Sequence, residues 1–316
     1  FEFDRSSGSM TQLQAIDEWE SPNFQTLHPN GEYLYSVASE TFTDETEEGT
    51  VVAYRIDRET GTLTQISARS SEGAGPAHVS VDPKGRFAYV SNYGAGNLSV
   101  YRLNDDGTLS EAVYVVDHEG SSVNERRQSA PHVHSAVPSA DGRFLYVSDL
   151  GIDKVMIYRV NGETGELELA EQPFVENMPG SGPRHFTIHP NNDFAYALEE
   201  MSSTIAAFEV DSSTGAMTQI QRISMLPEEF DGDNAAADLH VSPDGRFLYA
   251  SNRGHNSLVI YRIDQHSGEL TVVDHVSTEG PHPRNFMIDS KGEFVLVANR
   301  DESEVVIFRR DRQTGD

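Results

Sequence analysis

The chain has 316 residues, of which 51 are acidic and 23 are lysine or arginine, so its formal net charge is −28 at pH 7, and it has no cysteine. Such an excess of negative charge disfavours binding to nucleic acid or to an anionic membrane, and the lack of cysteine excludes disulfides and thiol chemistry. A solvated acidic coat and adaptation to high salt both fit this charge. No apolar run approaches the roughly 18 residues of a membrane-spanning helix. The first residues show no signal peptide, but the chain starts partway through a repeat, so this observation does not fix the location of the protein.

The chain begins with two predicted strands, Phe1–Asp4 and Ser7–Leu13, which match the second half of a repeat that then recurs six times. Each repeat reads as a turn, a strand, a tight turn and a second strand, as in Gly75–His78 followed by Phe87–Val90. Propeller blades repeat every 40 to 50 residues or so. The tight turns here recur at intervals of 47 to 57 residues, at Pro29, Pro83, Ala140, Pro190, Pro243 and Ser290.

Every full repeat continues into a third strand, such as Ala53–Asp57, and a fourth, such as Gly61–Ile66, whereas the last repeat stops after Val306–Phe308 and Thr314–Asp316. Short alternating runs bounded by Gly, Asn, Asp and Pro are typical of strands and turns. We therefore predict an all-β, seven-bladed β-propeller with four antiparallel strands per blade. Residues 1–316 are expected to form a single domain whose terminal blade is incomplete at both chain ends.

Aromatic residues recur once per repeat on the second and third strands. Because the repetition is regular, we interpret them as packing between neighbouring sheets rather than as a carbohydrate-stacking surface. Those of the second strands are Phe87, Phe144, Phe194, Phe247 and Phe294, and those of the third strands are Tyr54, Tyr101, Tyr158, Phe208, Tyr261 and Phe308.

Function is expected where the repeats differ. In such a blade the start of the first strand and the end of the second border the central channel at the same face. These loops hold several Arg and His residues in an otherwise acidic chain, which indicates an anionic small-molecule ligand. The candidate catalytic residues are His132, His134, Arg184, Glu200 and Arg253. The candidate substrate-binding residues are His78, Asn92, His185, Asn252, His255, Arg284 and Asn299.

Several of these residues have a plainer interpretation. His78 and His240 share a register and, taken alone, are more simply explained by hydrogen bonds to a neighbouring blade. Arg184 and Arg253 could instead form salt bridges between blades. His132 and His134 lack a third ligand at suitable spacing, so no metal is expected. The acidic runs Asp44–Glu48 and Pro227–Asp233 are interpreted as solvated loops, since neither follows a calcium-binding spacing.

Four segments of the chain resemble the lactonase family of seven-bladed propellers, which includes bacterial 6-phosphogluconolactonases of the propeller type and the fungal carboxy-cis,cis-muconate lactonising enzyme. The segments are Ala130–Ser135, Asp149–Val155, Gly182–Phe186 and Ser251–Ser257. The resemblance implies a catalytic set of one His, two Arg and one Glu, which by motif fall on His132 or His134, Arg184, Arg253 and Glu200. The family usually reads Asn-Glu-Leu where this chain has Glu199-Glu200-Met201, so either glutamate is a candidate, with Glu200 preferred.

Lactone hydrolysis requires a base that activates water, a positive group at the carbonyl oxygen and an anchor for the anionic substrate. We assign the base to Glu200 or His134, the positive group to Arg184 or Arg253, and the anchor to Arg284, with no metal or organic cofactor. The expected substrate is a small anionic lactone. The resemblance implies a cytoplasmic enzyme that acts on 6-phosphogluconolactone of the pentose phosphate route, and the expected state is a monomer or weak homodimer. A lactonising cycloisomerase and a non-catalytic binding propeller remain the alternatives.

Overall fold

The computed structural model describes residues 1–39 and 47–316, and these form 25 β-strands without any helix. The all-β prediction is therefore confirmed for the described part of the chain. Of the acidic run predicted as a solvated loop, residues 44–46 lie outside the described residues, and Glu48 begins a strand instead. The second acidic run, Pro227–Asp233, is a connection between strands, as predicted.

The chain divides into two compact units. Unit 1 comprises Phe1–Ile152 with Tyr158–Leu169, and unit 2 comprises Asp153–Ile157 with Ala170–Asp316. The division passes through one four-stranded sheet. The single domain expected from the repeats stays a prediction.

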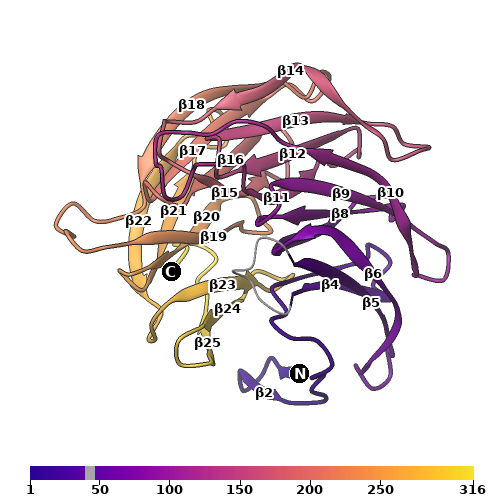
Figure 1. Ribbon diagram of the computed structural model, residues 1–316. Helices are drawn as coiled ribbons and strands as arrows, with labels where there is room; N and C mark the ends of the chain where they lie inside the picture. Colours follow the sequence, from indigo (N-terminus) through magenta and orange to yellow (C-terminus); the bar gives the residue numbers. More distant parts are fainter. Residues whose placement is uncertain (40–46) are drawn as a thin grey trace. The chain divides into compact units, whose positions relative to one another are not determined.

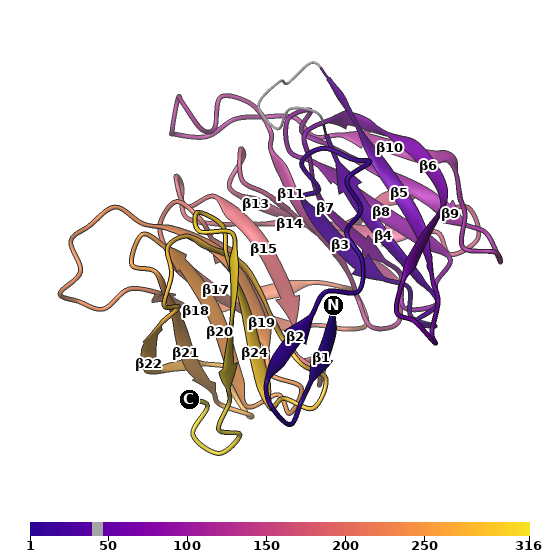
Figure 2. The ribbon, with the colours of Figure 1, turned by 90° about the horizontal axis from the view of Figure 1, so that it is seen from below.

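The strands that lie wholly within unit 1 form three sheets in chain order. Figure 2 shows the short hairpin β1–β2 beside the N-terminus. The strands are β1 (Glu2–Asp4) and β2 (Ser9–Thr11); β3 (Phe24–Leu27), β4 (Tyr33–Ala38), β5 (Glu48–Ile56) and β6 (Leu63–Ala74); and β7 (Pro76–Val81), β8 (Phe87–Asn92), β9 (Asn97–Leu103) and β10 (Leu109–Asp117). The divided sheet consists of β11 (Val133–Pro138), β12 (Phe144–Asp149), β13 (Lys154–Val160) and β14 (Leu167–Glu176).

Three further sheets lie in unit 2, and their strands also pair in chain order (Figure 1). They are β15 (Pro183–Ile188), β16 (Phe194–Glu199), β17 (Thr204–Val210) and β18 (Met217–Ser224); β19 (Ala235–Val241), β20 (Phe247–Arg253), β21 (Ser257–Ile263) and β22 (Leu270–Ser277); and β23 (Pro283–Ile288), β24 (Phe294–Asn299) and β25 (Glu304–Arg309). Five sheets thus have the four strands predicted. The two-stranded β1–β2 and the three-stranded β23–β25 match the partial repeats at the two ends of the sequence.

The recurring aromatic side chains lie in the core, as predicted. In unit 2, Tyr196, Leu198 and Ile205 of one sheet pack against Leu239 and Tyr261 of the next. An arginine that follows a third-strand aromatic can also have a packing role, because Arg102 lies 5.0 Å from the ring centroid of Phe87 and Arg262 lies 4.9 Å from that of Phe247. Phe308 of the last sheet is only half-buried.

In five of the described sheets the first strand pairs irregularly where it begins. In the sheet β15–β18, Pro183 pairs with Glu199 and His185 pairs with Leu198, so Arg184 is an extra residue, a β-bulge. Bulges re-aim a side chain and occur often beside active sites. The same register shift recurs in the other sheets at Ala77, His134 and Arg284, and between Ala236 and Leu239.

A second recurrent position follows the end of each second strand. The backbone N–H of Glu200 donates to the Gly182 carbonyl at 2.7 Å, and that of Arg300 donates to the His282 carbonyl at 3.0 Å. Tyr93 and Leu150 bond the carbonyls of Gly75 and His132 in the same way. In these four sheets the bulge and the end of the second strand therefore lie side by side, as the sequence predicted for the two groups of loops.

Candidate active site

Arg184, Glu200 and Arg253 form a buried ionic cluster in unit 2. Oε2 of Glu200 accepts a hydrogen bond of 2.9 Å from Nη1 of Arg184 and lies 3.0 Å from Nη2 of Arg253. The three side chains are 5%, 6% and 8% exposed, respectively. The structure thus brings together three of the five predicted catalytic residues around one carboxylate oxygen.

The backbone holds both guanidinium groups in place. Nε of Arg184 donates to the Ala237 carbonyl at 2.7 Å, and Nη2 of Arg253 donates to the Ala236 carbonyl at 2.7 Å. The loop before Arg184 is fixed in turn by Asp153, whose carboxylate accepts the N–H groups of Gly180 and Gly182. Such support from main-chain groups is typical of a preorganised site.

The cluster carries one more positive than negative charge. Burial lowers the pKa of Arg184 to about 10, against the opposing influence of the Glu200 carboxylate, so the guanidinium stays charged at neutral pH. The cluster joins two sheets, which is also the geometry of the inter-blade salt bridge considered above. A simple ion pair has one guanidinium for each carboxylate. The second guanidinium leaves a net positive charge, which favours the binding of an anion.

The adjacent glutamate has a different environment. Glu199 is fully buried, and its carboxylate oxygens accept two hydrogen bonds of 2.9 Å from Arg222, one of 2.8 Å from Asn177 and another from Thr204. Its side chain therefore ties its own sheet together. Of the two candidates left open by the sequence, the one that meets Arg184 and Arg253 is Glu200.

Asp238 forms a second polar centre beside this cluster, which the sequence did not predict. Its Oδ1 lies 2.7 Å from Nδ1 of His185, and its Oδ2 lies 3.1 Å from Nε2 of His240 and 2.6 Å from Nδ2 of Asn285. The side chain of Asp238 is 2% exposed. His185 thus points to a carboxylate of the next sheet, whereas the bond of His240 to Asp238 stays within its own strand. The ring centroid of His240 lies 4.8 Å from that of Phe286 in the neighbouring sheet, and the hydrogen bond to a neighbouring blade stays a prediction. Burial lowers the pKa of His185, although its bond to Asp238 opposes this.

A group of basic residues lies near the cluster. Arg284 occupies the bulge of its sheet, Arg300 occupies the strand exit, and His282 precedes the strand. Burial, together with the charges of Arg300, Arg253 and Arg284, lowers the pKa of His282 to about 4 against the opposing charge of Asp301. His282 was not predicted from the sequence. The signal was present, because Pro281-His282 repeats the Pro131-His132 motif at the same place in its sheet.

His132 and His134 lie in unit 1, and both contact the ring of Tyr93. The ring centroid of Tyr93 is 4.4 Å from that of His132, in a stacked arrangement, and 5.5 Å from that of His134, edge-on. His132 also bonds the Tyr93 carbonyl through Nδ1 at 2.8 Å. His134, like Arg184, is the bulged residue of its sheet, and it is buried. His78 is buried with its ring centroid 4.3 Å from that of Phe24 in the neighbouring sheet.

The three candidate asparagines are buried at the ends of second strands. The amide of each donates to a carbonyl at or near the end of the fourth strand of the preceding sheet, from Asn92 to Ser71, from Asn252 to Met225 and from Asn299 to Thr278. These contacts link neighbouring sheets, and the substrate-binding role of the asparagines stays a prediction. His255 bonds Ser257 and lies edge-on to the rings of Phe230 and His275.

The conformation of Gly254 fixes the loop that follows Arg253. Its φ is 142°, and an added Cβ would collide with the Asp233 carbonyl and lie 2.9 Å from Cα of Asn234. We expect Gly254→Ala to lower the free energy of unfolding by about 1–3 kcal/mol, because both the dihedral and the contact are unfavourable. Urea unfolding measures this. Gly8→Ala is the control, since φ is also positive there but no atom lies within 4 Å. An equal loss in the two variants would contradict the expected collision.

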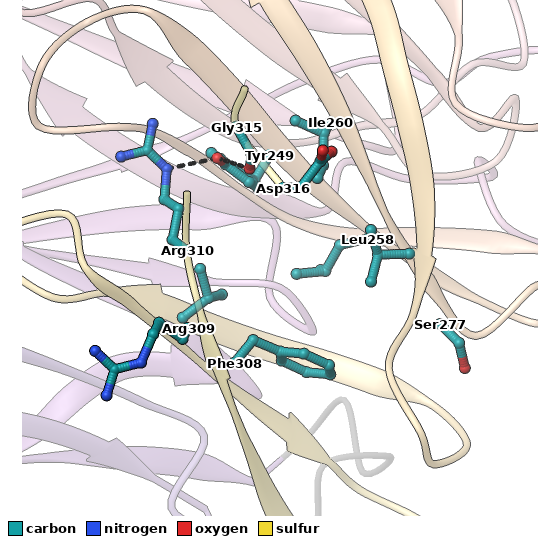
Figure 3. A pocket seen from close by; sticks show the side chains of 11 residues that line it. Tyr249, Leu258, Ile260, Ser277, Phe308, Arg309, Arg310, Gly315 and Asp316 are labelled. Atoms are coloured by element: carbon teal, nitrogen blue, oxygen red, sulfur yellow. Dashed lines mark hydrogen bonds between the residues drawn. The ribbon is translucent and has the colours of Figure 1, made fainter. Parts of the chain in front are cut away.

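Concave features elsewhere lack this chemistry. A cavity of about 70 Å³ in unit 2 is lined mainly by apolar side chains such as Leu258, Ile260 and Phe308 (Figure 3). Its polar lining includes Arg310 and Tyr249, whose Nε and hydroxyl groups form a hydrogen bond of 2.6 Å. Across the described residues, no group of three or more His, Cys, Asp or Glu side chains is arranged to hold a metal ion. Nor does that part of the chain contain a helix long and apolar enough to span a membrane.

The sheets and the cluster define an all-β repeat protein with a carboxylate held between two arginines. The chain belongs to the lactonase family, since the model described as "Lactonase, 7-bladed beta-propeller" matches residues 1–316. It is 34% identical over 289 residues to the 6-phosphogluconolactonase of Bacillus subtilis, covering 92% of this chain and 80% of the relative. It is 36% identical over 293 residues to the 6-phosphogluconolactonase of Formosa agariphila, covering 92% and 81%.

A solved structure agrees with this. The periplasmic gluconolactonase PpgL of Pseudomonas aeruginosa superimposes with a TM-score of 0.93 at 36% identity, covering 99% of this chain and 88% of that one. The resemblance inferred from the four sequence segments is confirmed.

Proposed function

We propose that this protein hydrolyses a sugar lactone, with 6-phosphogluconolactone as the substrate and 6-phosphogluconate as the product. The observation that carries the proposal is the buried pair of arginines on Glu200 in a member of the lactonase family. The names of the relatives support the substrate.

The chemistry follows from the charges of the cluster. Glu200 is held as a carboxylate by two guanidiniums and accepts a proton from the attacking water. The hydroxide adds to the lactone carbonyl, and Arg184 or Arg253 stabilises the charge that develops on its oxygen. The bond from the acyl carbon to the ring oxygen then breaks, and the ring oxygen takes the proton back. One water is consumed, and no cofactor takes part. The roles predicted for His132 and His134 stay predictions.

The purified protein is expected to accelerate the loss of 6-phosphogluconolactone above its spontaneous rate. A pH-stat assay with a panel of plain and phosphorylated lactones measures this, because each turnover releases one acid group. If no lactone in the panel disappears faster with the protein than without it, the proposed function is wrong.

We also infer that the seven sheets form the blades of one closed propeller. The family description and the number of sheets support this. A single cooperative unfolding transition in calorimetry is expected, and two separate transitions would contradict a single closed ring. The cytoplasmic location and the monomeric or weakly dimeric state stay predictions.

A further inference from the structure

His282 has an unusual backbone conformation. Its φ is 60°, in the left-handed region, although prolines stand on both sides of it at 281 and 283. A residue other than glycine is uncommon in this region, and a following proline restricts its backbone further. Strained residues of this kind cluster at sites that contact ligands.

Two hydrogen bonds hold this conformation. The N–H of His282 donates to Oδ1 of Asn256 at 3.0 Å, and the His282 carbonyl accepts the N–H of Arg300 at 3.0 Å. Asn256 is itself left-handed, with a φ of 54°. The sheets β19–β22 and β23–β25 therefore both hold the backbone of His282 in place.

Several charged groups act on this imidazole. Arg300 and Asp301 approach from the exit of β24, where Nδ1 of His282 lies 3.7 Å from Oδ2 of Asp301. Arg284 approaches from the start of β23 and Arg253 from the end of β20, and both disfavour protonation of the ring. Within the described chain, Nε2 of His282 is buried and has no hydrogen-bond partner. The ring is neutral at physiological pH because burial, together with the charges of the three arginines, lowers its pKa to about 4 and outweighs the opposing charge of Asp301.

The basic residues around His282 interact electrostatically with the ionic cluster of Arg184, Glu200 and Arg253. Arg284 occupies the same bulge position as Arg184, and its charge also disfavours the charged form of Arg184. The bulge of the intervening sheet carries Ala237, so Arg184 reaches the carbonyl of that residue. Arg253 acts on His282 while it contacts Glu200.

We propose that His282, Arg284 and Arg300 form the subsite for the phosphate of a phosphorylated lactone, and that His282 takes up a proton from solvent when the phosphate binds. This inference rests on the proposed lactonase function. Guanidinium groups bind phosphate oxygens through paired hydrogen bonds. A bound dianion offsets the positive potential that, together with burial, keeps the imidazole neutral, and its own charge favours the protonated ring, which then gives a further donor. A plain sugar lactone leaves this subsite empty.

The subsite is tested by calorimetric titration with the two product acids, 6-phosphogluconate and gluconate. The wild-type protein is expected to bind 6-phosphogluconate at least about tenfold more tightly, consistent with one charge-assisted phosphate contact. Arg284→Gln should remove most of this preference and leave gluconate binding unchanged. Arg312→Gln, which removes an equal charge from an exposed position of the same unit, should keep it.

Two outcomes would overturn the subsite. One is equal affinity of the wild type for both acids. The other is an equal decrease of the affinity for both acids in Arg284→Gln. Because product binding needs no turnover, failure of the lactonase assay with the preference intact would refute the proposed reaction and leave the subsite standing.

Proton uptake is tested by repeating the 6-phosphogluconate titration near pH 6 in two buffers of different ionisation enthalpy. The wild type is expected to take up a proton on binding, whereas the variant His282→Asn is not. Asparagine is chosen because it tolerates a left-handed backbone. Equal uptake by the two proteins, with the variant folded by circular dichroism, would show that the phosphate or another group takes the proton and would refute the role of His282.

Discussion

Glu200→Gln is expected to lower the turnover of lactone by about 10²–10⁴-fold, the range that a positioned base contributes. Glutamine keeps the shape of the side chain but cannot accept a proton from water at neutral pH. It also leaves the two guanidiniums without an anion, so a bound substrate meets more positive charge in its ground state. Turnover is measured by pH-stat at a temperature well below the unfolding midpoint. A variant that keeps more than a tenth of the wild-type turnover would remove Glu200 from the proposed chemistry.

The neighbouring glutamate provides a matched control. Glu199→Gln makes the same chemical change one residue away, where the carboxylate meets Arg222, Asn177 and Thr204. We expect this variant to lose about 1–3 kcal/mol of stability, since hydrogen bonds to a buried charged group are lost. Its turnover below the unfolding midpoint should stay within about twofold of the wild type, because nothing at the ionic cluster changes. If Glu199→Gln loses turnover and Glu200→Gln keeps it, Glu199 and not Glu200 is the base.

The sequence predicted the sheets well because the repeat carries its own signals. Turn residues at Pro83 and Pro190, each followed by an aromatic strand, recur at intervals close to those of propeller blades, and their strand-and-turn composition excludes helical repeats. The partial sheets at the ends of the chain followed from the same register. Local patterns of this kind depend on neighbouring residues, which a single sequence contains.

The site was harder to predict because it depends on bulges. A shift of one residue moves a side chain to the opposite face of a strand, so the sequence could not separate Glu199 from Glu200. The register now shows that His134, and not His132, corresponds to Arg184. Asp238 escaped notice for another reason. Its partners His185 and Asn285 lie 53 and 47 residues away in the chain.

Asp238→Asn is expected to lower the free energy of unfolding by about 3–5 kcal/mol, the cost of removing one partner from a buried charged pair. Besides the two imidazoles and Asn285, the carboxylate accepts the N–H groups of Leu239 and Phe286, at 3.0 and 3.2 Å. An asparagine has one acceptor oxygen and turns an NH₂ group toward the remaining donors. Urea unfolding measures the loss, and Asp231→Asn, at an exposed position of the same unit, controls for the change in charge.

The loss in Asp238→Asn should depend on pH. Burial acts to raise the pKa of Asp238, but the charge of His240 and the hydrogen bonds of both imidazoles outweigh it and lower that pKa. The carboxylate therefore stabilises the protein above its unfolded pKa of about 3.9. Burial likewise opposes the charged form of His240, but Asp238 outweighs it and raises the pKa of this imidazole. That contribution is complete below the unfolded value of about 6.5 and is lost as the pH rises through the folded one.

Both charges are present together between these two limits, so the difference between wild type and Asp238→Asn should be greatest at about pH 4–6.5 and should shrink at higher pH. His185 adds a smaller opposing trend. Because its pKa is lowered, the native state resists protonation below about pH 6.5 and loses some stability there. A His240→Asn background should remove most of the decrease at high pH. If the loss is instead constant from pH 5 to pH 9, Asp238 acts through hydrogen bonds that do not depend on the charge of His240.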